Sequence, residues 1–481
     1  ATNAFLADWK LIMANLVALL LLAATASAGI IGSRQEFEAE ISAKLDLVEF
    51  HREMASLNEE VAAEAAQNNA DIEEQLKKVG PIPLAAAKAA KDDEDVNGEI
   101  SDDLFQGDIV LTNAQLDAIT GSRKKRQAYT PPSFPATQWL TNRPIPYEFD
   151  GRVAEDVRNI FRAAAKFWTE NSCLTFQENA AGKERIRVIN GGGCFSAIGM
   201  SGGVQELSLQ ASGCNRFSTA AHELEHAIGV YHEQSRFDRD QYVELNTANI
   251  IKESLYNFNK ENNTFTKNYD VPYEFGSNMH YAQNDFYRDW TKPTLVAKRG
   301  YEEYQHSMRG HSPSFLDVLL VNRFYKCTDK CGNSNRCRNY GYPHPRDCSK
   351  CVCPEGWGGA DCSGEPAGAQ VVTATRTPQV ARIEVGKYGE TKIVHDNKFL
   401  IIKAQPGQKI LLTVKTLNAQ IQGEGCFSNG LEIKNKADLR ARGLRFCGYE
   451  APKQTIESTA GRVAILIYAN SYTTSADIEY R

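Results

Sequence analysis

Apolar positions recur with two different periods, and the period changes along the chain. In residues 153–172, VAEDVRNIFRAAAKFWTENS, apolar side chains return every three to four residues, which predicts an amphipathic helix with Glu155 and Asp156 in its early turns. The segments RPIPYEFDG (143–151) and RIRVIN (185–190) are typical of strands. Because helices and strands are mixed here, we expect an α+β fold for residues 127–327.

The regions on either side differ from this mixture. Upstream, EISAKLDLVEFHREMASLNEEVAAEAA is rich in helix-forming residues, and an acidic stretch follows it. Beyond residue 365, alternating apolar positions in QKILLTVKTL, GLEIKNK and RVAILIYA are separated by Gly, Pro and Asn turns, which predicts the short strands of an all-β sandwich. A chain of 481 residues with 42% hydrophobic residues is long enough for several such domains.

The N-terminal region carries a candidate targeting segment. An apolar run from Leu16 to Ala24 precedes the small residues Ala26, Ser27 and Ala28, a pattern that predicts a signal peptide over residues 1–28. The alternative is a membrane anchor, but the run is shorter than the roughly 20 residues that a spanning helix needs. We therefore expect a secreted, extracellular protein without a stable membrane anchor.

Charge and cysteine content narrow the class further. The formal net charge is −6 and no basic stripe is present, so nucleic acid is not an expected partner. None of the twelve cysteines precedes Cys173. An even number of cysteines behind a signal peptide indicates disulfides formed in an oxidising compartment, with structural zinc as the less favoured alternative.

Residues 29–126 have the composition of a removable propeptide. The segment contains no cysteine and ends at SRKKR, four basic residues from Arg123 to Arg126, directly before a Pro-rich stretch. In an exposed loop of a secreted chain this pattern predicts cleavage after Arg126 by a dibasic-specific convertase. The alternative is a solvated run of charges.

The stretch HELEHAIGVYHEQSRFDRD, residues 222–240, carries the chemistry of the chain. Two histidines four residues apart, His222 and His226, project from one helical face, and Glu223 lies within reach of a water on the metal. Gly229 lets the chain leave the helix, so that His232 can return as a third ligand. Three protein nitrogens leave one position open, as in a catalytic zinc site. The alternatives are an exposed helix with incidental histidines and a bound zinc without catalysis; retention of Glu223 argues against the second.

This stretch resembles the extended zinc signature of the astacin family of metzincin peptidases, and SNMHY at 277–281 is similar to the Met-turn of that family. The resemblance implies a two-lobed catalytic domain with one zinc ion, in which Met279 forms the floor beneath the imidazoles and Tyr281 is a displaceable ligand that stabilises the oxyanion. It also implies that Glu223 is the general base and acid of peptide hydrolysis. We expect His280 to be structural and Glu225 to face solvent.

The resemblance bears on several residues around this centre. It pairs Cys173 with Cys327 and Cys194 with Cys214, and it places the glycine-rich NGGGCFSAIGMSGG at an edge strand and loop lining the cleft. In the family, the acid after the third histidine, here Glu233, often binds the new N-terminal amine; neighbouring arginine or backbone groups are the alternative partners here.

Upstream, LFQGD contains Phe105, Gly107 and Asp108, similar to the motif by which astacin prosegments place an aspartate on the zinc. Asp108 would then close the open position in the latent precursor, unless it is a solvated acid. In PTLVAKRG, Lys298 stands where some members of the family carry a basic residue in the pocket just after the scissile bond; a surface lysine explains it equally well.

The C-terminal part resembles two further modules. Residues 328–363 look like an EGF-like domain, for which the expected pairs are Cys331–Cys348, Cys337–Cys351 and Cys353–Cys362, without an acidic consensus for calcium. Residues 364–481 resemble a CUB domain with Cys426 paired to Cys447, in which Asn429 stands where a calcium-binding Asp often lies. Asn262 begins a glycosylation sequon.

Together these features predict a secreted zinc endopeptidase, made as a latent zymogen, that acts on extracellular proteins such as matrix or cuticle proteins. The rival hypothesis is an adhesion or scaffold protein that binds matrix through its C-terminal modules and carries an inactive peptidase domain. The full set of His222, Glu223, His226, His232 and Tyr281 favours the enzyme.

Overall fold

The computed structural model describes most of the chain from residue 41 onward. The described residues are 41–42, 44–68, 72–80, 96–98, 100–120, 138–263, 266–332, 336–419, 424–449, 451–452 and 454–481. The predicted signal peptide and the predicted cleavage site at Arg126 lie outside them.

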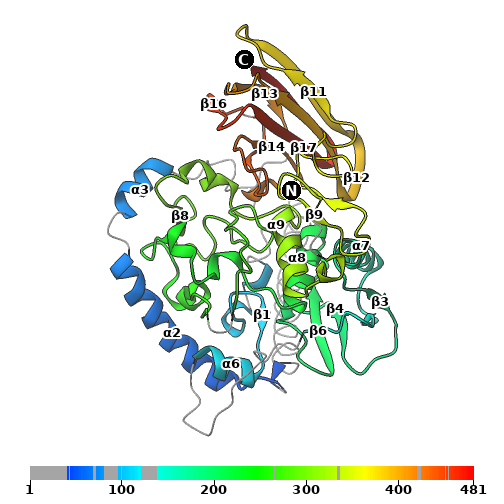
Figure 1. Ribbon diagram of the computed structural model, residues 1–481. Coiled ribbons are helices and arrows are strands. Elements are labelled where there is room, and N and C mark those ends of the chain that lie inside the picture. Colours follow the sequence, from blue (N-terminus) through cyan, green and yellow to red (C-terminus); the bar gives the residue numbers. More distant parts are fainter. Residues whose placement is uncertain are drawn as a thin grey trace, which may run out of the picture.

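A six-stranded sheet lies mainly in residues 138–327, which the sequence predicts to be catalytic and which are called the catalytic region below (Figure 1). Its strands lie in the order β1 (Ile109–Val110), β5 (Cys194–Ala197), β6 (Val204–Leu209), β4 (Arg185–Ile189), β2 (Ile145–Phe149) and β3 (Phe176–Glu178). Neighbouring strands are parallel except for β5, which is antiparallel to β6. The strands expected at 143–151 and 185–190 are therefore present, and the outermost strand β1 comes from the upstream segment.

Helices α7 (Glu155–Asn171) and α8 (Phe217–Ala227) pack with this sheet around one hydrophobic core. The apolar spacing of α7 buries Val157, Phe161 and Trp168, and the indole of Trp168 donates to the carbonyl of Ala221 in α8 over 3.0 Å. The amphipathic helix predicted for 153–172 is thus confirmed. The packing of α7 holds α8 in place, and α8 carries His222 and His226.

The remainder of the catalytic region is less regular. It contains the two-stranded pair β7 (Val243–Leu245) and β8 (Leu295–Ala297), helix α9 (Phe315–Phe324), and the 3₁₀ segments η2 (Glu233–Ser235), η3 (Arg239–Gln241), η4 (Lys252–Phe258) and η5 (Glu302–Ser307). Ser314 caps α9 through a capping box with Asp317. A second hydrophobic cluster lies here. Helices and strands are both present in the catalytic region, so the predicted mixture of helix and sheet is confirmed.

The upstream segment folds against the catalytic region. Its elements are α2 (Leu47–Asn68), α3 (Ile72–Val79), η1 (Ser101–Asp103), β1 and α6 (Asn113–Thr120), and α2 runs along one side of the molecule (Figure 1). Phe50, Met54 and Leu57 of α2 share a cluster with Ile198 and Tyr256 of the catalytic region. The two parts are therefore joined by apolar burial as well as by β-pairing.

Two further regions follow α9. A disulfide-rich region contains the short pair β9 (Tyr342–Pro343) and β10 (Cys351–Val352). The C-terminal sheet contains β11 (Gln370–Thr373), β12 (Gln379–Lys403), β13 (Leu411–Asn418), β14 (Asn429–Lys434), β15 (Leu444–Phe446), β16 (Ile456–Glu457) and β17 (Arg462–Tyr480). The expectation of a short strand is wrong for RVAILIYA, which is part of the 19-residue β17; its long partner β12 contains none of the segments expected to be strands. Register shifts after Lys387 and after Thr391 let this long pair continue through its glycines instead of ending there.

The twelve cysteines form six disulfides, which lie in all parts of the chain after α7. Their pairs are Cys173–Cys327, Cys194–Cys214, Cys331–Cys348, Cys337–Cys351, Cys353–Cys362 and Cys426–Cys447. The first ties the end of α7 to the residues just after α9, and the second joins the start of β5 to the segment between β6 and α8.

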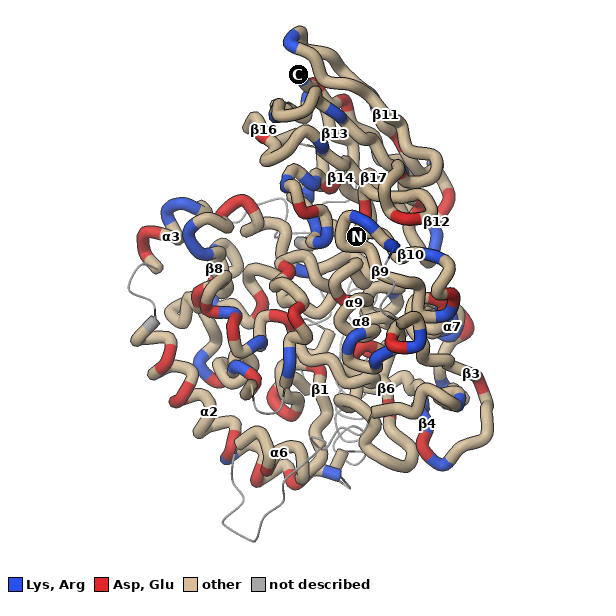
Figure 2. The backbone as a smooth tube through the Cα atoms, viewed as in Figure 1, with Lys and Arg blue, Asp and Glu red and all other residues tan. Residues whose placement is uncertain are grey.

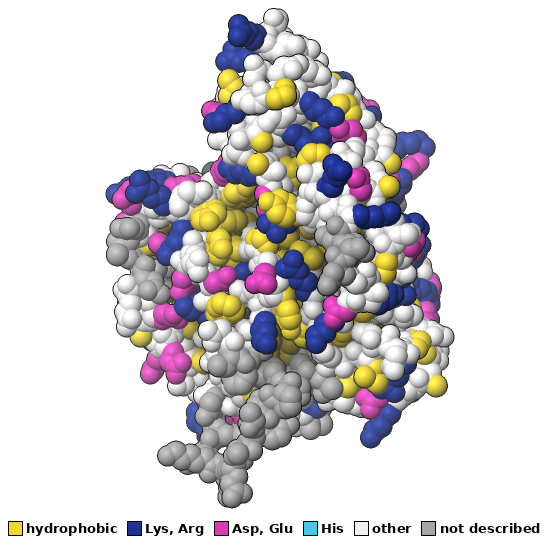
Figure 3. Space-filling model, viewed as in Figure 1, with side chains coloured by type: hydrophobic (Ala, Val, Ile, Leu, Met, Phe, Trp, Pro, Cys, Tyr) yellow, Lys and Arg dark blue, Asp and Glu magenta, His cyan; other side chains and the backbone are white. Residues whose placement is uncertain are grey.

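Two arginines join the C-terminal sheet to the catalytic region. Arg445 donates to the carbonyl of Met308 over 3.2 Å, and Arg442 donates to the hydroxyl of Ser312 over 2.9 Å. Both are buried at this junction. Hydrophobic side chains gather near the middle of the face seen in Figure 3. Acidic and basic residues are intermingled along the backbone in Figure 2. Within the described residues, no helix is both long and apolar enough to cross a bilayer.

Candidate metal centre

Helix α8 and the loop after it bring three histidines together. His222 and His226 lie one turn apart on α8, and their ring centroids are 4.6 Å apart. Gly229 has a φ of +101°, a conformation that glycine adopts readily, and there the chain turns out of the helix. His232 then returns to within 4.7 Å of His226, centroid to centroid.

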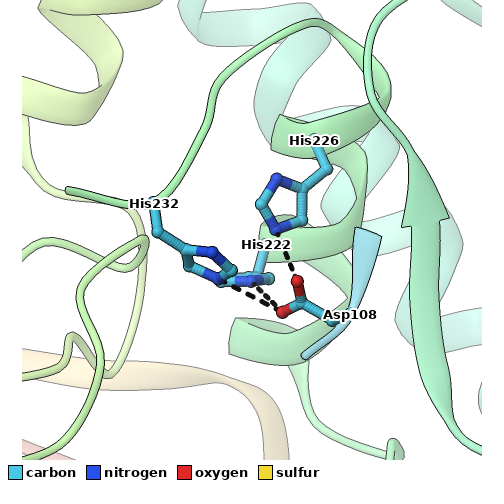
Figure 4. A group of neighbouring side chains, drawn as sticks. All are labelled: Asp108, His222, His226 and His232. Atoms are coloured by element: carbon cyan, nitrogen blue, oxygen red, sulfur yellow. Dashed lines mark hydrogen bonds and ion pairs between the residues drawn. The ribbon is translucent and has the colours of Figure 1, made fainter. Parts of the chain in front are cut away.

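Asp108, just before β1 in the upstream segment, lies among these histidines (Figure 4). Its Oδ2 is 3.0 Å from Nε2 of His222 and 3.2 Å from Nε2 of His232, and its Oδ1 is 3.3 Å from Nε2 of His226. The four potential ligand atoms lie within 4.8 Å of one another. The preceding Gly107 has a φ of +79°, and a Cβ there would lie only 2.8 Å from the ring of Phe286, so this close approach requires glycine.

Hydrogen bonds at the other ring nitrogen orient each imidazole. Nδ1 of His222 donates to the carbonyl of Asn278, and Nδ1 of His226 donates to the carbonyl of Val230, both over 2.7 Å. Nδ1 of His232 donates to the side-chain oxygen of Gln106 over 3.0 Å. With Nδ1 engaged, all three Nε2 atoms face Asp108, as in protein metal sites with oriented histidine ligands.

The protonation states suit a metal. Burial lowers the pKa of His226, and it lowers that of His232 to about 3, so both rings are neutral near pH 7. Burial alone would raise the pKa of Asp108, but the surrounding imidazoles outweigh it and hold that pKa well below its usual range. Nε2 of His226 and Oδ1 of Asp108 are both buried, without a hydrogen-bond partner among the described residues. Three imidazoles and one carboxylate form a donor set that fits zinc.

The other residues expected at the centre surround it. Glu223 is buried and lines the same cavity as His222, Asp108 and Tyr281. The hydroxyl of Tyr281 donates to the carbonyl of Gln106 over 2.7 Å, and its ring lies 4.8 Å from that of His232. Met279 is buried in the core cluster that includes α8 residues.

His280 and Glu233 have partners away from the metal ligands. His280 is buried between the Tyr273 hydroxyl and the Tyr281 carbonyl, 2.7 Å from each, which agrees with a structural role. Glu233 accepts from the Arg236 guanidinium over 3.0 Å and from the backbone N–H of Glu274 over 2.9 Å. Arginine and backbone groups thus satisfy Glu233 in this structure.

Glu225 corrects one expectation. The sequence predicts that it faces solvent, but it is fully buried. Every residue of α8 except His222 is buried, so this helix has no exposed polar face on which Glu225 could lie. Burial, with the nearby charges of Asp317 and Glu233, raises the pKa of Glu225 well above its ordinary value.

Two other candidates lie elsewhere. Lys298 lines a separate cavity beside α2, where its ammonium is 3.5 Å from Glu244, and it is not among the residues around the zinc-site cavity. Asn262 is exposed. Asn429 is fully buried and donates to the carbonyl of Ser471 over 2.7 Å.

Several residues at the centre carry no signal in the sequence. Gln106 lies within LFQGD, where the motif gives it no role, and its amide reaches the buried carboxylate of Glu261 over 2.7 Å. Burial raises the pKa of Glu261 to about 8, and the bond from Gln106 acts against that rise. Phe427 of the C-terminal sheet lines the zinc-site cavity together with Arg309, whose Cζ is 5.0 Å from the ring centroid. No local sequence signal could reveal these contacts, because each joins segments far apart in the chain.

A buried HExxH helix, a third histidine after a glycine turn and an upstream carboxylate beside them define a zinc metallopeptidase centre. The sequence profile of the Astacin peptidase family matches residues 132–326. The chain is 36% identical over 399 residues to zinc metalloproteinase nas-31 of Caenorhabditis elegans, covering 79% of this chain and 64% of that protein. It is 32% identical to nas-17 of the same organism, covering 83% of this chain and 92% of that one.

Among solved structures, the chain is similar to high choriolytic enzyme 1, a hatching enzyme zinc-protease from Oryzias latipes. The identity is 32% over 38% of this chain and 88% of that one, with a TM-score of 0.35. On the basis of the sequence relatives, the chain belongs to the astacin family of zinc metalloproteinases.

Proposed function

We propose that this protein is a secreted, zinc-dependent endopeptidase that hydrolyses peptide bonds in extracellular proteins. His222, His226 and His232 would hold one zinc ion per catalytic domain. The observation that carries this proposal is the convergence of three Nε2 atoms, each oriented through Nδ1, beside the buried Glu223.

Bound zinc would supply Lewis acidity that polarises the scissile carbonyl and makes a water more acidic. Glu223 would take the proton of the attacking water and deliver it to the leaving amine, which suits its burial one residue after His222. Tyr281 would donate its hydroxyl hydrogen to the oxyanion, since this hydroxyl already donates to a carbonyl inside the cleft. Met279 would support the histidines from below.

We further propose that residues 29–126 form a propeptide that keeps the enzyme latent after removal of a signal peptide, residues 1–28. Asp108 would occupy the fourth ligand position, where a substrate carbonyl or the attacking water must otherwise lie. Its 3.0–3.3 Å distances to the three histidines support this assignment. Cleavage after Arg126 by a convertase would release the segment.

The remaining regions would serve recognition. We assign residues 127–327 to the peptidase domain, 328–363 to an EGF-like module and 364–481 to a CUB-like module. Matrix or cuticle proteins are the substrate class that we propose, and Asn262, which is exposed, is the proposed glycosylation site. Lys298 as a determinant of substrate choice is the weakest of these assignments, because it lines a different cavity.

Glu223→Ala tests the catalytic assignment. The convertase-treated variant should keep its zinc content and lose the hydrolysis of denatured casein, whereas the parent enzyme should lose activity only on chelation. Full activity in the variant would overturn the role of Glu223. A parent enzyme that holds zinc but never cleaves casein would instead favour an adhesion or scaffold protein.

Asp108→Ala tests latency. It is introduced together with Arg126→Ala, so that the precursor stays uncleaved. The double variant should hydrolyse casein while the Arg126→Ala precursor stays silent. Equal silence in both would overturn the role of Asp108.

A further inference from the structure

The side chain of Gln106 fills a buried pocket beside the metal centre. Its oxygen accepts from Nδ1 of His232 over 3.0 Å, and its nitrogen donates to Oε1 of Glu261 over 2.7 Å. All three residues are buried, and this is the one hydrogen bond of the Glu261 carboxylate within the described residues. The pocket therefore offers one fixed donor and one fixed acceptor.

The orientation of the amide follows from the chemistry of the imidazole. Because Nε2 of His232 faces the metal site, Nδ1 must carry the ring hydrogen and can only donate. The amide oxygen of Gln106 therefore faces His232, which leaves the amide nitrogen to face Glu261. A carboxyl group presents an acceptor oxygen there in either protonation state.

We propose that this pocket, once the upstream segment has left, is a substrate subsite that selects a side-chain carboxamide, with Glu261 and His232 Nδ1 as its two recognition groups. The inference rests on the proposed peptidase function. A glutamine side chain pairs with both groups. A methionine of similar length pairs with neither, and a glutamate directs an oxygen at Glu261 and pairs with it only when the Glu261 carboxyl is protonated. Leaving buried polar groups unpaired is costly, and a site built to hydrogen-bond a side chain discriminates strongly against analogues that lack the partner.

The backbone of Gln106 lies where a substrate would lie. Its carbonyl accepts from the hydroxyl of Tyr281 over 2.7 Å, and the residue lines the same cavity as His222 and Glu223. Departure of the upstream segment would therefore empty this pocket into the cleft. The occupant that replaces Gln106 must meet the same donor and acceptor.

Matched peptides test the proposal. Each set carries Gln, Met or Glu at one of three positions on either side of the cleaved bond, and binding is measured by fluorescence anisotropy with convertase-treated, zinc-loaded Glu223→Ala protein. At one position, and at a pH above 8 where Glu261 is ionised, the Gln peptide should bind about tenfold or more tightly than its Met and Glu counterparts. The same ranking should appear in kcat/KM with the active enzyme.

Glu261→Gln is the decisive variant, made in the Glu223→Ala protein for binding and in the active enzyme for kinetics. An amide at 261 can donate to a substrate carboxylate, so the advantage of Gln over Glu should shrink to about threefold or reverse. Glu178→Gln, at the far edge of the sheet on β3, is the control and should keep the original ranking. Equal binding of the three peptides at all positions would overturn the proposal, and so would a ranking that Glu261→Gln leaves unchanged.

The outcome is separable from that of the proposed function. Peptide binding is measured without catalysis, so failure of the parent enzyme to cleave casein overturns the peptidase assignment alone. Casein hydrolysis without any preference for Gln overturns the subsite alone.

Discussion

The side-chain amide of Asn97 pairs with both backbone polar atoms of Cys194. The N–H of Cys194 donates to Oδ1 of Asn97, and Nδ2 of Asn97 donates to the carbonyl of Cys194, each over 2.7 Å. The same Nδ2 also donates to the carbonyl of Gly107 over 3.0 Å. One buried amide of the upstream segment therefore ties strand β5 to the loop that carries Asp108.

Asn97→Ala should weaken latency. The substitution removes three hydrogen bonds at a buried site, each worth about 1 kcal/mol, so the open form of the proposed precursor should become on the order of 100-fold more populated. The measurement is residual peptidase activity in a precursor kept intact by Arg126→Ala. The control Glu49→Ala, on the exposed side of α2, should show no gain. Residual activity equal to that of the parent precursor would show that Asn97 does not hold the segment.

Removal of the metal should destabilise the precursor more than it destabilises a variant lacking Asp108. Four protein groups surround the metal site when Asp108 is in place. A metal ion that binds only the folded state stabilises that state, and the gain grows with the logarithm of the metal affinity. We expect chelation to lower the Tm of the precursor, and zinc to restore it. The shift should be smaller for Asp108→Ala. Differential scanning calorimetry with parallel zinc analysis checks this, and equal shifts for the two proteins would contradict it.

The local elements of the site could be predicted because their signals are short-range. The apolar spacing of Val157, Phe161 and Trp168 defines α7, and the spacing of His222 and His226 defines one face of α8. Gly229 adopts the positive φ that its place after the helix suggests. Each of these features depends on residues within a few positions of one another.

The contacts between distant segments could not be predicted in the same way. An amphipathic helix normally exposes its polar face, which predicts Glu225 at the surface, but α8 is enclosed on all sides. Gln106 reaches Glu261, and Phe427 reaches the metal-site cavity, only through tertiary packing. The continuity of β12 through its glycines depends on its pairing with β17, which a single strand does not reveal.

Arg445→Met should destabilise the catalytic region together with the C-terminal sheet. The guanidinium of Arg445 is fully buried and donates to carbonyls on both sides of the junction, those of Gly425 at 2.7 Å and Met308 at 3.2 Å among them. Removing a buried charged donor leaves these carbonyls unpaired, at a cost of about 3 kcal/mol or more.

Urea denaturation followed by peptidase activity and by circular dichroism measures this effect. Both signals should move to lower urea. Arg382→Met, which breaks only exposed pairs with Glu384 and Asp477, should change the midpoint little. Loss of the circular dichroism signal alone, with an unchanged activity midpoint, would show that the two regions unfold independently.

Glu274 should make the stability of the protein fall as the pH rises. Burial, with the nearby charge of Asp317, raises its pKa to about 8 against the opposing hydrogen bonds from Ser314 and from the backbone N–H of Arg442. The unfolded carboxyl titrates near 4.5, so between these values the folded state holds a proton that the unfolded state has lost. The contribution is therefore fully present below pH 4.5 and is lost as the pH rises through 8.

Glu274→Gln cannot titrate and should remove this slope. Relative to the variant, wild-type protein should lose stability from pH 5.5 to 8, by at most about 1.4 kcal/mol per pH unit. Urea midpoints at several pH values check this. Glu390→Gln is the control, because Lys387 lowers the pKa of Glu390 and places its titration below this range. Parallel stability curves for wild type and Glu274→Gln would contradict this prediction. They would mean that Glu274 stays charged in the folded protein, because the charge and the backbone N–H of Arg442, across the junction with the C-terminal sheet, outweigh the effect of burial.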